Sequence, residues 1–123
     1  MLKANIYNDT TTHEGVFCVN VSINHIVSDL SISDFMFESV SGDIDNIILP
    51  DDVSINYVGR QTLCVILIEV PDDVIGSFRI SMRDRQYTVD NDRYGISPEA
   101  IDVPDTEQYR IECSPKVFNY VGD

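Results

Sequence analysis

A period-two alternation of apolar and polar side chains constrains this sequence more than any other feature. It is clearest in GVFCVNVSIN, residues 15–24, where Phe17, Val19, Val21 and Ile23 make one face wholly apolar. Successive side chains of a strand point to opposite faces, so this pattern is typical of a half-buried β-strand. A helical period of 3.6 is not sustained anywhere along the chain. The alternation therefore predicts an all-β protein.

The same pattern recurs between turn residues and predicts further short strands. They are expected within residues 2–8 (as an edge strand), 33–39, 52–58, 62–70, 76–83, 108–113 and 116–121. Valine, isoleucine and aromatic residues are abundant, whereas alanine is nearly absent, and this composition suits a pleated, half-buried surface. Seven or eight strands with frequent turns predict an antiparallel β-sandwich.

A chain of 123 residues is long enough for one domain with a real core. We expect that core within about residues 3–82, followed over 83–123 by a long loop and C-terminal strands. Residues 83–106 are poor in apolar side chains and are expected to be a loop or a loosely attached segment. Within it, Ser97 and Pro98 predict one helical turn over 97–102.

Part of the pattern resembles the bacterial Ig-like domains, which repeat along surface adhesins and also decorate phage structural proteins. In that family an F-x-V-x-I strand precedes V-x-G-F-x-x-x-D-F, and G-x-V-x-V follows a turn containing proline. The matching residues here are Phe17, Val19, Val21, Val27, Leu30, Ser33, Asp34, Phe35, Gly76, Phe78 and Ile80. The resemblance covers about residues 3–82 and implies an Ig-like sandwich. It departs at Asp29-Leu30 and at 92–95, and residues 96–123 lie outside it.

The net charge of −13, with only eight bases, restricts the partners of this protein. Nucleic-acid binding needs clustered lysine and arginine, so we expect no nucleic-acid partner and no attraction to anionic membranes. Four of the bases lie between Arg79 and Arg93, where Asp84, Asp90 and Asp92 are expected to neutralise them at the surface. The longest apolar run, residues 63–68, has strand length, so no membrane insertion is expected.

The three cysteines, Cys18, Cys64 and Cys113, form no close pair in sequence. An odd number of separated thiols needs no explanation in a reducing compartment. Cys18 lies on the less apolar face of its expected strand, so a disulfide with Cys64 across the core is not predicted. The N-terminal residues show no apolar signal-peptide segment, and synthesis in a cytoplasm is expected.

The acidic residues offer one candidate metal site. Asp90, Asp92 and Gly95 occupy the first, third and sixth positions of an EF-hand-like calcium loop. Position twelve would be Ile101 rather than a bidentate glutamate, so a solvated loop is the favoured interpretation and no metal or cofactor is assigned. Other pairs of acids are interpreted as turns, in which aspartate bonds the local backbone. They are Asp43 with Asp45, Asp51 with Asp52, and Asp72 with Asp73.

Catalytic motifs are absent, and we assign no catalytic residues. The only histidines are His13 and His25, and His25 would lie about 23 Å from Cys18 along an extended chain. A Cys–His pair with Cys64 or Cys113 stays open, as do paired carboxylates for a small carbohydrate-active or metal-dependent enzyme. A lone sandwich with an unbroken core leaves little room for a deep cleft, however.

Residues 62–70, TLCVILIEV, are apolar on both faces. Such a strand should be central in its sheet, or its second face should be covered. The favoured interpretation is cover by residues 83–123 of the same chain, and the alternative is cover by another protein.

Together these features predict a non-enzymatic structural or attachment module. The favoured role is a phage virion component, in a tail, baseplate, fibre or capsid decoration, that docks through a strand edge or an apolar face. Expected partners are other structural proteins or further copies of the chain, with host surface glycans as a further ligand. The alternative is one Ig-like repeat of a bacterial cell-surface adhesin, which would place the chain outside the cell.

Overall fold

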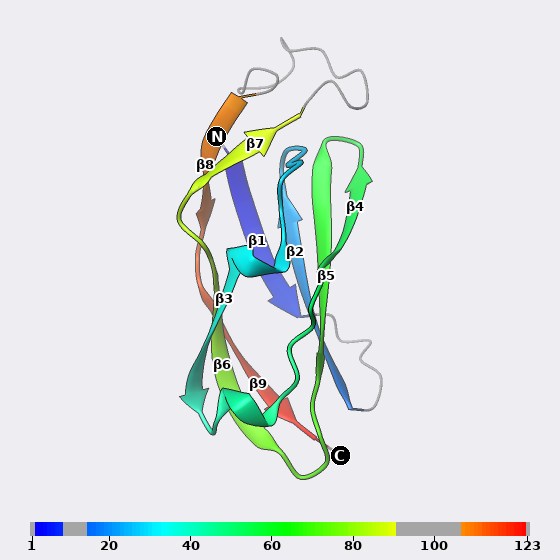
Figure 1. The fold of residues 1–123 in the computed structure, drawn as a ribbon, viewed down its shortest axis with the longest axis vertical. Helices are drawn as coiled ribbons and strands as arrows, with labels where there is room; N and C mark the ends of the chain where they lie inside the picture. Colours follow the sequence, from blue (N-terminus) through cyan, green and yellow to red (C-terminus); the bar gives the residue numbers. More distant parts are fainter. Residues whose placement is uncertain (1, 9–14, 91–106, 123) are drawn as a thin grey trace.

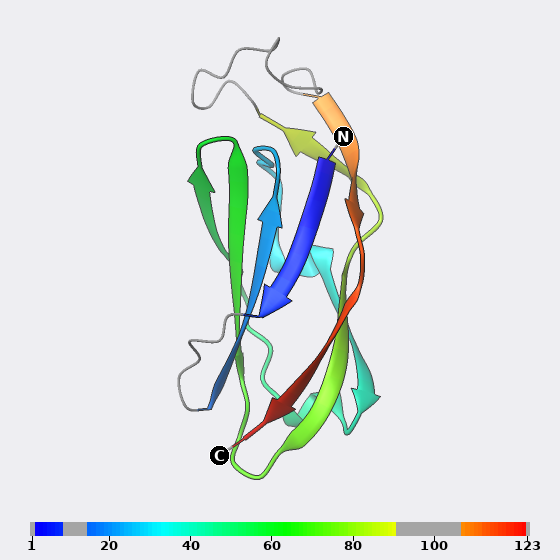
Figure 2. The ribbon, with the colours of Figure 1, turned by 180° about the vertical axis from the view of Figure 1, so that it is seen from behind.

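The computed structural model describes residues 2–8, 15–90 and 107–122, which form two β-sheets packed face to face (Figure 1). The larger sheet has six strands in the order β4-β5-β2-β1-β8-β7. Their bounds are β4 Ser54–Val58, β5 Gln61–Glu69, β2 Val16–Ile23, β1 Leu2–Asn8, β8 Glu107–Cys113 and β7 Gln86–Val89. Seen from behind, β4, β5, β2 and β1 follow one another as neighbours (Figure 2).

The smaller sheet has the order β3-β6-β9 and lies against one end of the larger one. It consists of β3 (Phe35–Ser41), β6 (Ile75–Met82) and β9 (Lys116–Val121). Two single turns of 3-10 helix flank β3, at Ile32–Asp34 (η1) and Ile44–Asn46 (η2). The predicted β-sandwich is confirmed, with nine strands among the described residues, where seven or eight were expected.

The strand pairing differs from the prediction at β1. All strand pairs are antiparallel except β1 and β8, which run parallel from Leu2 opposite Ile111 to Ala4 opposite Cys113. The expectation that residues 2–8 form an edge strand is therefore wrong, because β1 lies between β2 and β8. Its inward residues Leu2 and Ile6 are buried, which an edge position does not require.

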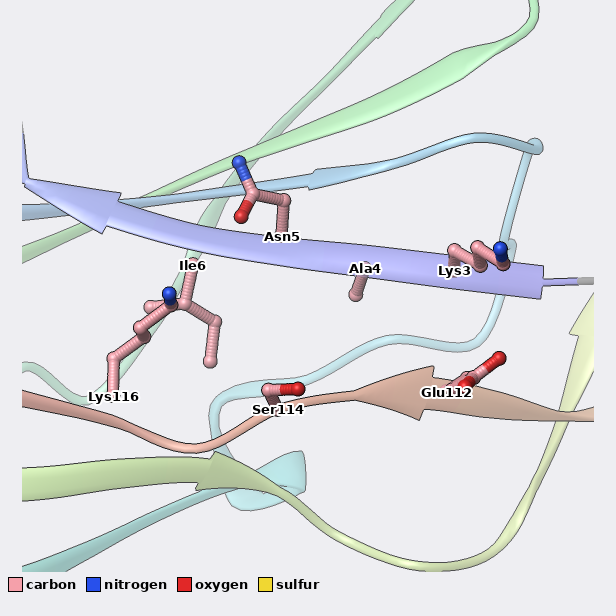
Figure 3. A pocket seen from close by; sticks show the side chains of 7 residues that line it. All are labelled: Lys3, Ala4, Asn5, Ile6, Glu112, Ser114 and Lys116. Carbon is pink, nitrogen blue, oxygen red and sulfur yellow. The ribbon is translucent and has the colours of Figure 1, made fainter.

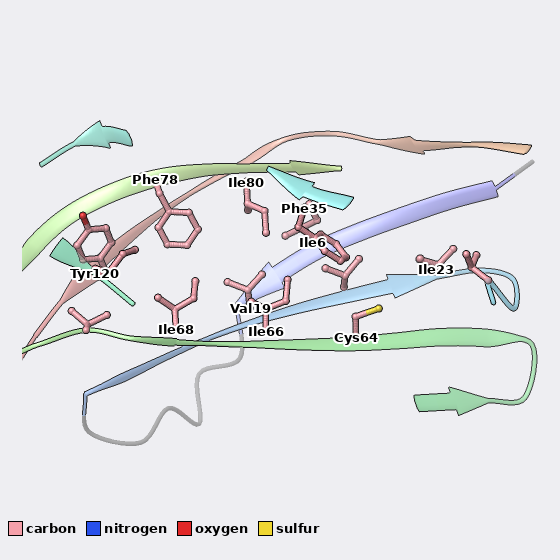
Figure 4. Close-up of a cluster of buried hydrophobic side chains, with 14 of the residues drawn as sticks. Ile6, Val19, Ile23, Phe35, Cys64, Ile66, Ile68, Phe78, Ile80 and Tyr120 are labelled. Atoms are coloured by element: carbon pink, nitrogen blue, oxygen red, sulfur yellow. The ribbon is translucent and has the colours of Figure 1, made fainter. Parts of the chain in front are cut away.

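The core lies between the inward faces that the alternation predicts (Figure 4). Val19, Val21 and Ile23 of β2 are fully buried, and the smaller sheet contributes Phe78 and Ile80. Each such side chain stabilises the fold by about 1.5–3 kcal/mol relative to an exposed one. The ring of Phe78 lies 5.7–6.0 Å, centroid to centroid, from four other aromatic rings. They are Phe17, Phe37, Phe118 and Tyr120.

Close packing under this aromatic group explains one glycine. Gly76 of β6 lies opposite Tyr120 of β9. A Cβ atom at Gly76 would collide with the Tyr120 ring and with the backbone oxygen of Ser41. The Tyr120 side chain and the backbone of β3 can therefore lie this close to β6, within the smaller sheet, only because residue 76 has no side chain.

The chain that follows β2 covers the β7 edge of the larger sheet. Val27 pairs with Val89, the Ser28 N–H donates to the Thr88 carbonyl, and the Asp90 N–H donates to the Ile26 carbonyl. The buried hydroxyl of Thr62 holds this segment from the other side. It donates to the His25 carbonyl (2.7 Å) and accepts from the Val27 N–H (3.0 Å).

The prediction for residues 83–106 is wrong over its first part. Residues 86–89 form β7, and its side chains Tyr87 and Val89 are buried. The core thus extends beyond residues 3–82 to include Leu2, Tyr87 and Tyr120. The strands expected at 108–113 and 116–121 are confirmed as β8 and β9. The helical turn expected over 97–102 lies outside the described residues, as does His13.

Across the described residues, none of the helical segments is long and apolar enough to cross a bilayer.

Candidate functional site

A group of interacting charged side chains surrounds Arg85, just before β7. Its guanidinium binds the Asp34 carboxylate in bidentate fashion, with Nε to Oδ1 at 2.7 Å and Nη2 to Oδ2 at 2.9 Å. The Ser31 N–H also donates to Asp34 Oδ2 (3.0 Å), and the Asp34 side chain is only 2% exposed. In sequence, Asp34 lies between Ile32 and Phe35, which a sandwich would bury, and this position predicts an acidic outer face for Asp34. That prediction is wrong, because the carboxylate is buried.

Asp29 completes this arrangement, which we call the Arg85 cluster: Asp29, Asp34, Arg85 and Tyr87. Arg85 Nη1 donates to Asp29 Oδ2 at 3.1 Å and Nη2 donates to the Asp29 carbonyl at 2.8 Å. Asp29 also accepts from the N–H and the hydroxyl of Thr88. The guanidinium carbon lies 4.0 Å from the centre of the Tyr87 ring, in cation–π contact.

Every N–H of Arg85 is used within the protein. The fifth guanidinium N–H, on Nη1, donates to the Gln86 carbonyl at 2.8 Å. All five N–H groups of the side chain therefore have an acceptor. A ligand would have to displace one of these bonds. The Arg85 cluster therefore fastens the segment that follows β2 to β7, and it offers no free group for binding or catalysis.

The electrostatics of the Arg85 cluster agree with this structural role. Burial opposes ionisation of Asp34, but hydrogen bonds from Arg85 and Ser31 and the nearby arginine charges outweigh it, so its pKa lies below the usual range. The hydrogen bond to Asp34 in turn raises the pKa of Arg85. Burial, assisted by the Asp34 charge, raises the pKa of Tyr87 to about 12. Both members of the ion pair thus stay charged at neutral pH.

Two further ion pairs differ from the expectation that the acids and bases between residues 79 and 93 neutralise one another. Arg79 pairs with Glu38 across the smaller sheet at 3.7 Å. Asp84 pairs at 3.7 Å with Arg110 of β8. These pairs could not be predicted from the spacing of charges along the chain, because the partners are far apart in sequence.

The predicted turns formed by aspartates are present. The Asp43 carboxylate accepts from the Asp45 N–H at 2.9 Å, as expected for a residue that bonds its local backbone. Asp73 adopts a positive φ of 64° in the turn before β6. Of the candidate calcium loop only Asp90 is described, and Asp92 and Gly95 lie outside the described residues. Within residues 2–8, 15–90 and 107–122, no group of three acidic, histidine or cysteine side chains could hold a metal ion.

The three cysteines are free thiols: Cys64 is buried, and Cys18 and Cys113 are partly buried. Cys64 points into the core, where burial raises its pKa to about 12, and burial also raises the pKa of Cys113. A nucleophilic cysteine needs a lowered pKa, so neither environment favours the thiolate. His25 is buried with its Nδ1 3.0 Å from the Asn24 side chain, beyond the end of β2 and away from Cys18 near its start.

A shallow notch opens where β8 leaves β1 (Figure 3). Pairing of β1 with β8 stops at Ala4, after which β9 joins the other sheet. Lys3 and Glu112 lie at one end of the notch and Lys116 at the other. Charges of both signs line an open surface here, and this arrangement selects no particular ligand.

The outer face of β5 is only partly covered. Leu63 and Val65 are half-buried, but Leu67 is 53% exposed and borders a shallow groove with Val53 and Pro50. The favoured expectation was that residues 83–123 cover this face. The described strands of that segment lie elsewhere: β8 beside β1, and β9 beside β6.

A second apolar surface, which the sequence did not indicate, lies on the outer face of the smaller sheet. We call it the small-sheet patch, and it consists of Met36, Ile75, Val117 and Val121. Ile75 and Val121 pair directly and are 69% and 65% exposed. Exposed apolar groups that gather on one face mark interaction sites more often than scattered ones do.

No family model, curated protein or solved structure matches this chain.

Proposed function

We propose that this protein is a non-enzymatic structural or attachment module that docks through an apolar sheet face, as a component of a phage virion. A tail, baseplate, fibre or capsid decoration would each use such a module. Partners are other structural proteins or copies of the chain, and host surface glycans are a further ligand. We also propose that the sandwich is of the bacterial Ig-like kind.

The distribution of charge is the observation that carries this proposal. The nine described strands contain as many acids as bases, so the whole net charge of −13 lies outside them. The acids are Glu38, Glu69, Glu107 and Glu112, and the bases are Lys3, Arg79, Arg110 and Lys116. Neutral faces with exposed apolar side chains favour lateral docking, while acidic connections keep the particle soluble.

The chemistry of the described polar groups supports a role without catalysis. The Arg85 cluster is saturated with internal hydrogen bonds, and burial disfavours the thiolates of Cys64 and Cys113. Catalysis needs a group with a matched pKa in a cleft. A rigid scaffold with an exposed face needs neither.

The packing supports the Ig-like assignment. Phe17, Val19, Val21, Phe35, Phe78 and Ile80, which carry the resemblance to the bacterial Ig-like domains, all lie in one hydrophobic core. The sandwich also has a parallel pairing of β1 with β8, and β9 lies in the smaller sheet.

One observation favours the alternative, a repeat of a bacterial surface adhesin. β1 begins near one end of the long axis and β9 finishes at the other (Figure 1). Domains with this arrangement can be joined end to end, as tandem repeats require.

Fractionation of the producing culture tests the proposal. Particles are purified on a density gradient, and the chain is followed by an antibody and by mass spectrometry. We expect it to sediment with tail or capsid proteins. Recovery only from intact cells by surface proteolysis, within a longer polypeptide, would favour the adhesin, and recovery only as soluble cytoplasmic protein would contradict both.

A further inference from the structure

The small-sheet patch gathers four exposed apolar side chains on the outer face of one sheet. On the larger sheet, the exposed Tyr7, Val58 and Leu67 lie on three separate strands, and the exposed Ile48 bridges to Glu69 at the end of β5. On the smaller sheet, Met36, Ile75, Val117 and Val121 share one face of three adjacent strands. We propose that this patch binds the same patch of a second copy of the chain.

The pattern of side chains across β3, β6 and β9 forms rows on this face. The pair Ile75–Val121 forms an apolar row at one end. The row Glu38–Arg79–Val117 lies four residues further along β6, and Met36 with Ser81 follows. The polar row Ser77–Asn119 lies between the apolar row and the charged one. The face therefore carries apolar side chains in three of its four rows and extends over roughly 20 Å at the rise of a strand.

The charge of this surface permits a second copy as its occupant. The three strands carry one acid and two bases, Glu38, Arg79 and Lys116, although the chain as a whole carries −13. Two copies that meet here keep their acidic connections away from the contact. Repulsion between the copies is therefore weaker at this face than where their acidic connections would meet.

The pairing of Arg79 with Glu38 also suits two-fold symmetry. Their closest approach is 3.7 Å and both side chains are well exposed, so the pair contributes little within one copy. In a two-fold contact, residue i meets residue j while j meets i. Arg79 of each copy can then bind Glu38 of the other. Two ion pairs between the copies would replace the two ion pairs within them, and no charge would be left unpaired.

The edges of the smaller sheet favour a face contact over strand addition. β3 has an irregularity between Ser39 and Ser41, which leaves Val40 as an extra residue. β9 follows Pro115 and begins with Lys116. Bulges, proline and lysine are the features that protect edge strands from pairing with another chain. The contact therefore uses side chains of the face.

This inference rests on the proposed docking role, but its test is separate from particle fractionation. We would measure mass by light scattering over a dilution series of the wild type and of an Ile75→Thr, Val121→Thr double variant. Threonine keeps the β-branched shape and removes apolar surface. The matched control is Val58→Thr, Leu67→Thr, with similarly exposed residues on the larger sheet.

We expect the wild type to dimerise with a dissociation constant on the order of 10–100 μM, as for a small contact. The patch variant should bind about tenfold more weakly, and the control should match the wild type. A wild type that stays monomeric throughout the series overturns the inference. Equal weakening by both double variants overturns it too, because the contact would then not be confined to the patch.

Charge reversal gives a second test of the same contact. Glu38→Arg and Arg79→Glu each place like charges across the proposed axis, so each alone should dimerise more weakly than the wild type. An equimolar mixture should recover association, because the reversed patches attract each other. Failure of the mixture to associate better than either variant alone contradicts the symmetric contact.

The two kinds of failure can be told apart. A monomeric chain that sediments with particles retains the proposed function and places another protein on the patch. A chain that dimerises through the patch but never enters particles retains the inference and contradicts the virion role.

Discussion

Two arginine–carboxylate pairs in this protein have opposite environments. Arg85 binds Asp34 through two short bonds, and the carboxylate is buried with its remaining partner supplied by the Ser31 N–H. Arg79 and Glu38 meet at 3.7 Å on the outer face of the smaller sheet, exposed to water. The chemistry is the same, so the surroundings decide the role. The first pair holds segments of the fold together, and the second is available for exchange with a partner.

Replacing the arginine of each pair by alanine should give the largest difference in unfolding free energy between the two pairs. Arg85→Ala leaves a buried Asp34 carboxylate with one hydrogen bond and frees the backbone of Asp29, so we expect a loss of about 3 kcal/mol in unfolding free energy. Arg79→Ala should lose no more than about 0.5 kcal/mol. Urea denaturation followed by circular dichroism measures both, since the chain has no tryptophan. Similar losses in the two variants would contradict the assignment of roles.

Acid should remove the contribution of the buried pair. The pKa of Asp34 is lowered on folding, so the unfolded chain binds the proton more readily and the pair stabilises fully only above the usual aspartate pKa of about 3.9. As pH falls through that value and below it, the stability difference between the wild type and Asp34→Asn should shrink. Unfolding curves at pH 7 and through the acid range measure it. A constant difference would show that the Asp34 charge does not stabilise the fold.

Tyr87 offers a smaller change within the Arg85 cluster. Tyr87→Phe keeps the ring under Arg85 but removes the 2.7 Å hydrogen bond to the Arg83 carbonyl, for a loss of about 1 kcal/mol. The pKa of Tyr87 in the folded wild type, about 12, exceeds the value in the unfolded chain. The extra unfolding free energy of the wild type over Tyr87→Phe should therefore decline as pH rises above about 10. The exposed Tyr7→Phe is the control and should leave stability unchanged at neutral pH. A loss in Tyr7→Phe equal to that in Tyr87→Phe would remove the distinction.

Substitutions in the small-sheet patch should have the least effect on folding. In dilute solution, Ile75→Thr with Val121→Thr should change the unfolding free energy by no more than about 0.5 kcal/mol, because both side chains are already exposed. Thermal and urea unfolding of the monomer measure it. A loss of several kcal/mol would mean that the patch belongs to the folding core and is not a surface kept for a partner.

The strands could be predicted because alternation is a local property of the sequence. Val19, Val21, Phe78 and Ile80 all lie on the predicted inward faces. The parallel pairing of β1 with β8 could not, because it joins residues more than a hundred positions apart, and alternation does not specify which strands are neighbours.

The candidate sites were harder to predict than the strands. Asp34 and Arg85 lie 51 residues apart, and in sequence Asp34 looks like any other acid of an acidic segment. The small-sheet patch was missed although residues 116–121 are apolar on both faces, with Val117 and Val121 on one face and Phe118 and Tyr120 on the other. Only the sheet order brings Ile75 onto the face of Val117 and Val121. The sequence shows that β5 is apolar on both faces. It does not show which segment, if any, covers the outer face, where Leu67 is exposed.

Amide NMR spectra recorded at low and high protein concentration test the central claim most directly. The account predicts that the amide signals that move on concentration belong to the outer face of the smaller sheet, around Ile75, Arg79, Val117 and Val121. Signals of Asp34, Arg85 and the outer face of β5 should stay fixed. Concentration-dependent shifts centred on Leu67 or on the Arg85 cluster, or no shifts at all, would contradict it.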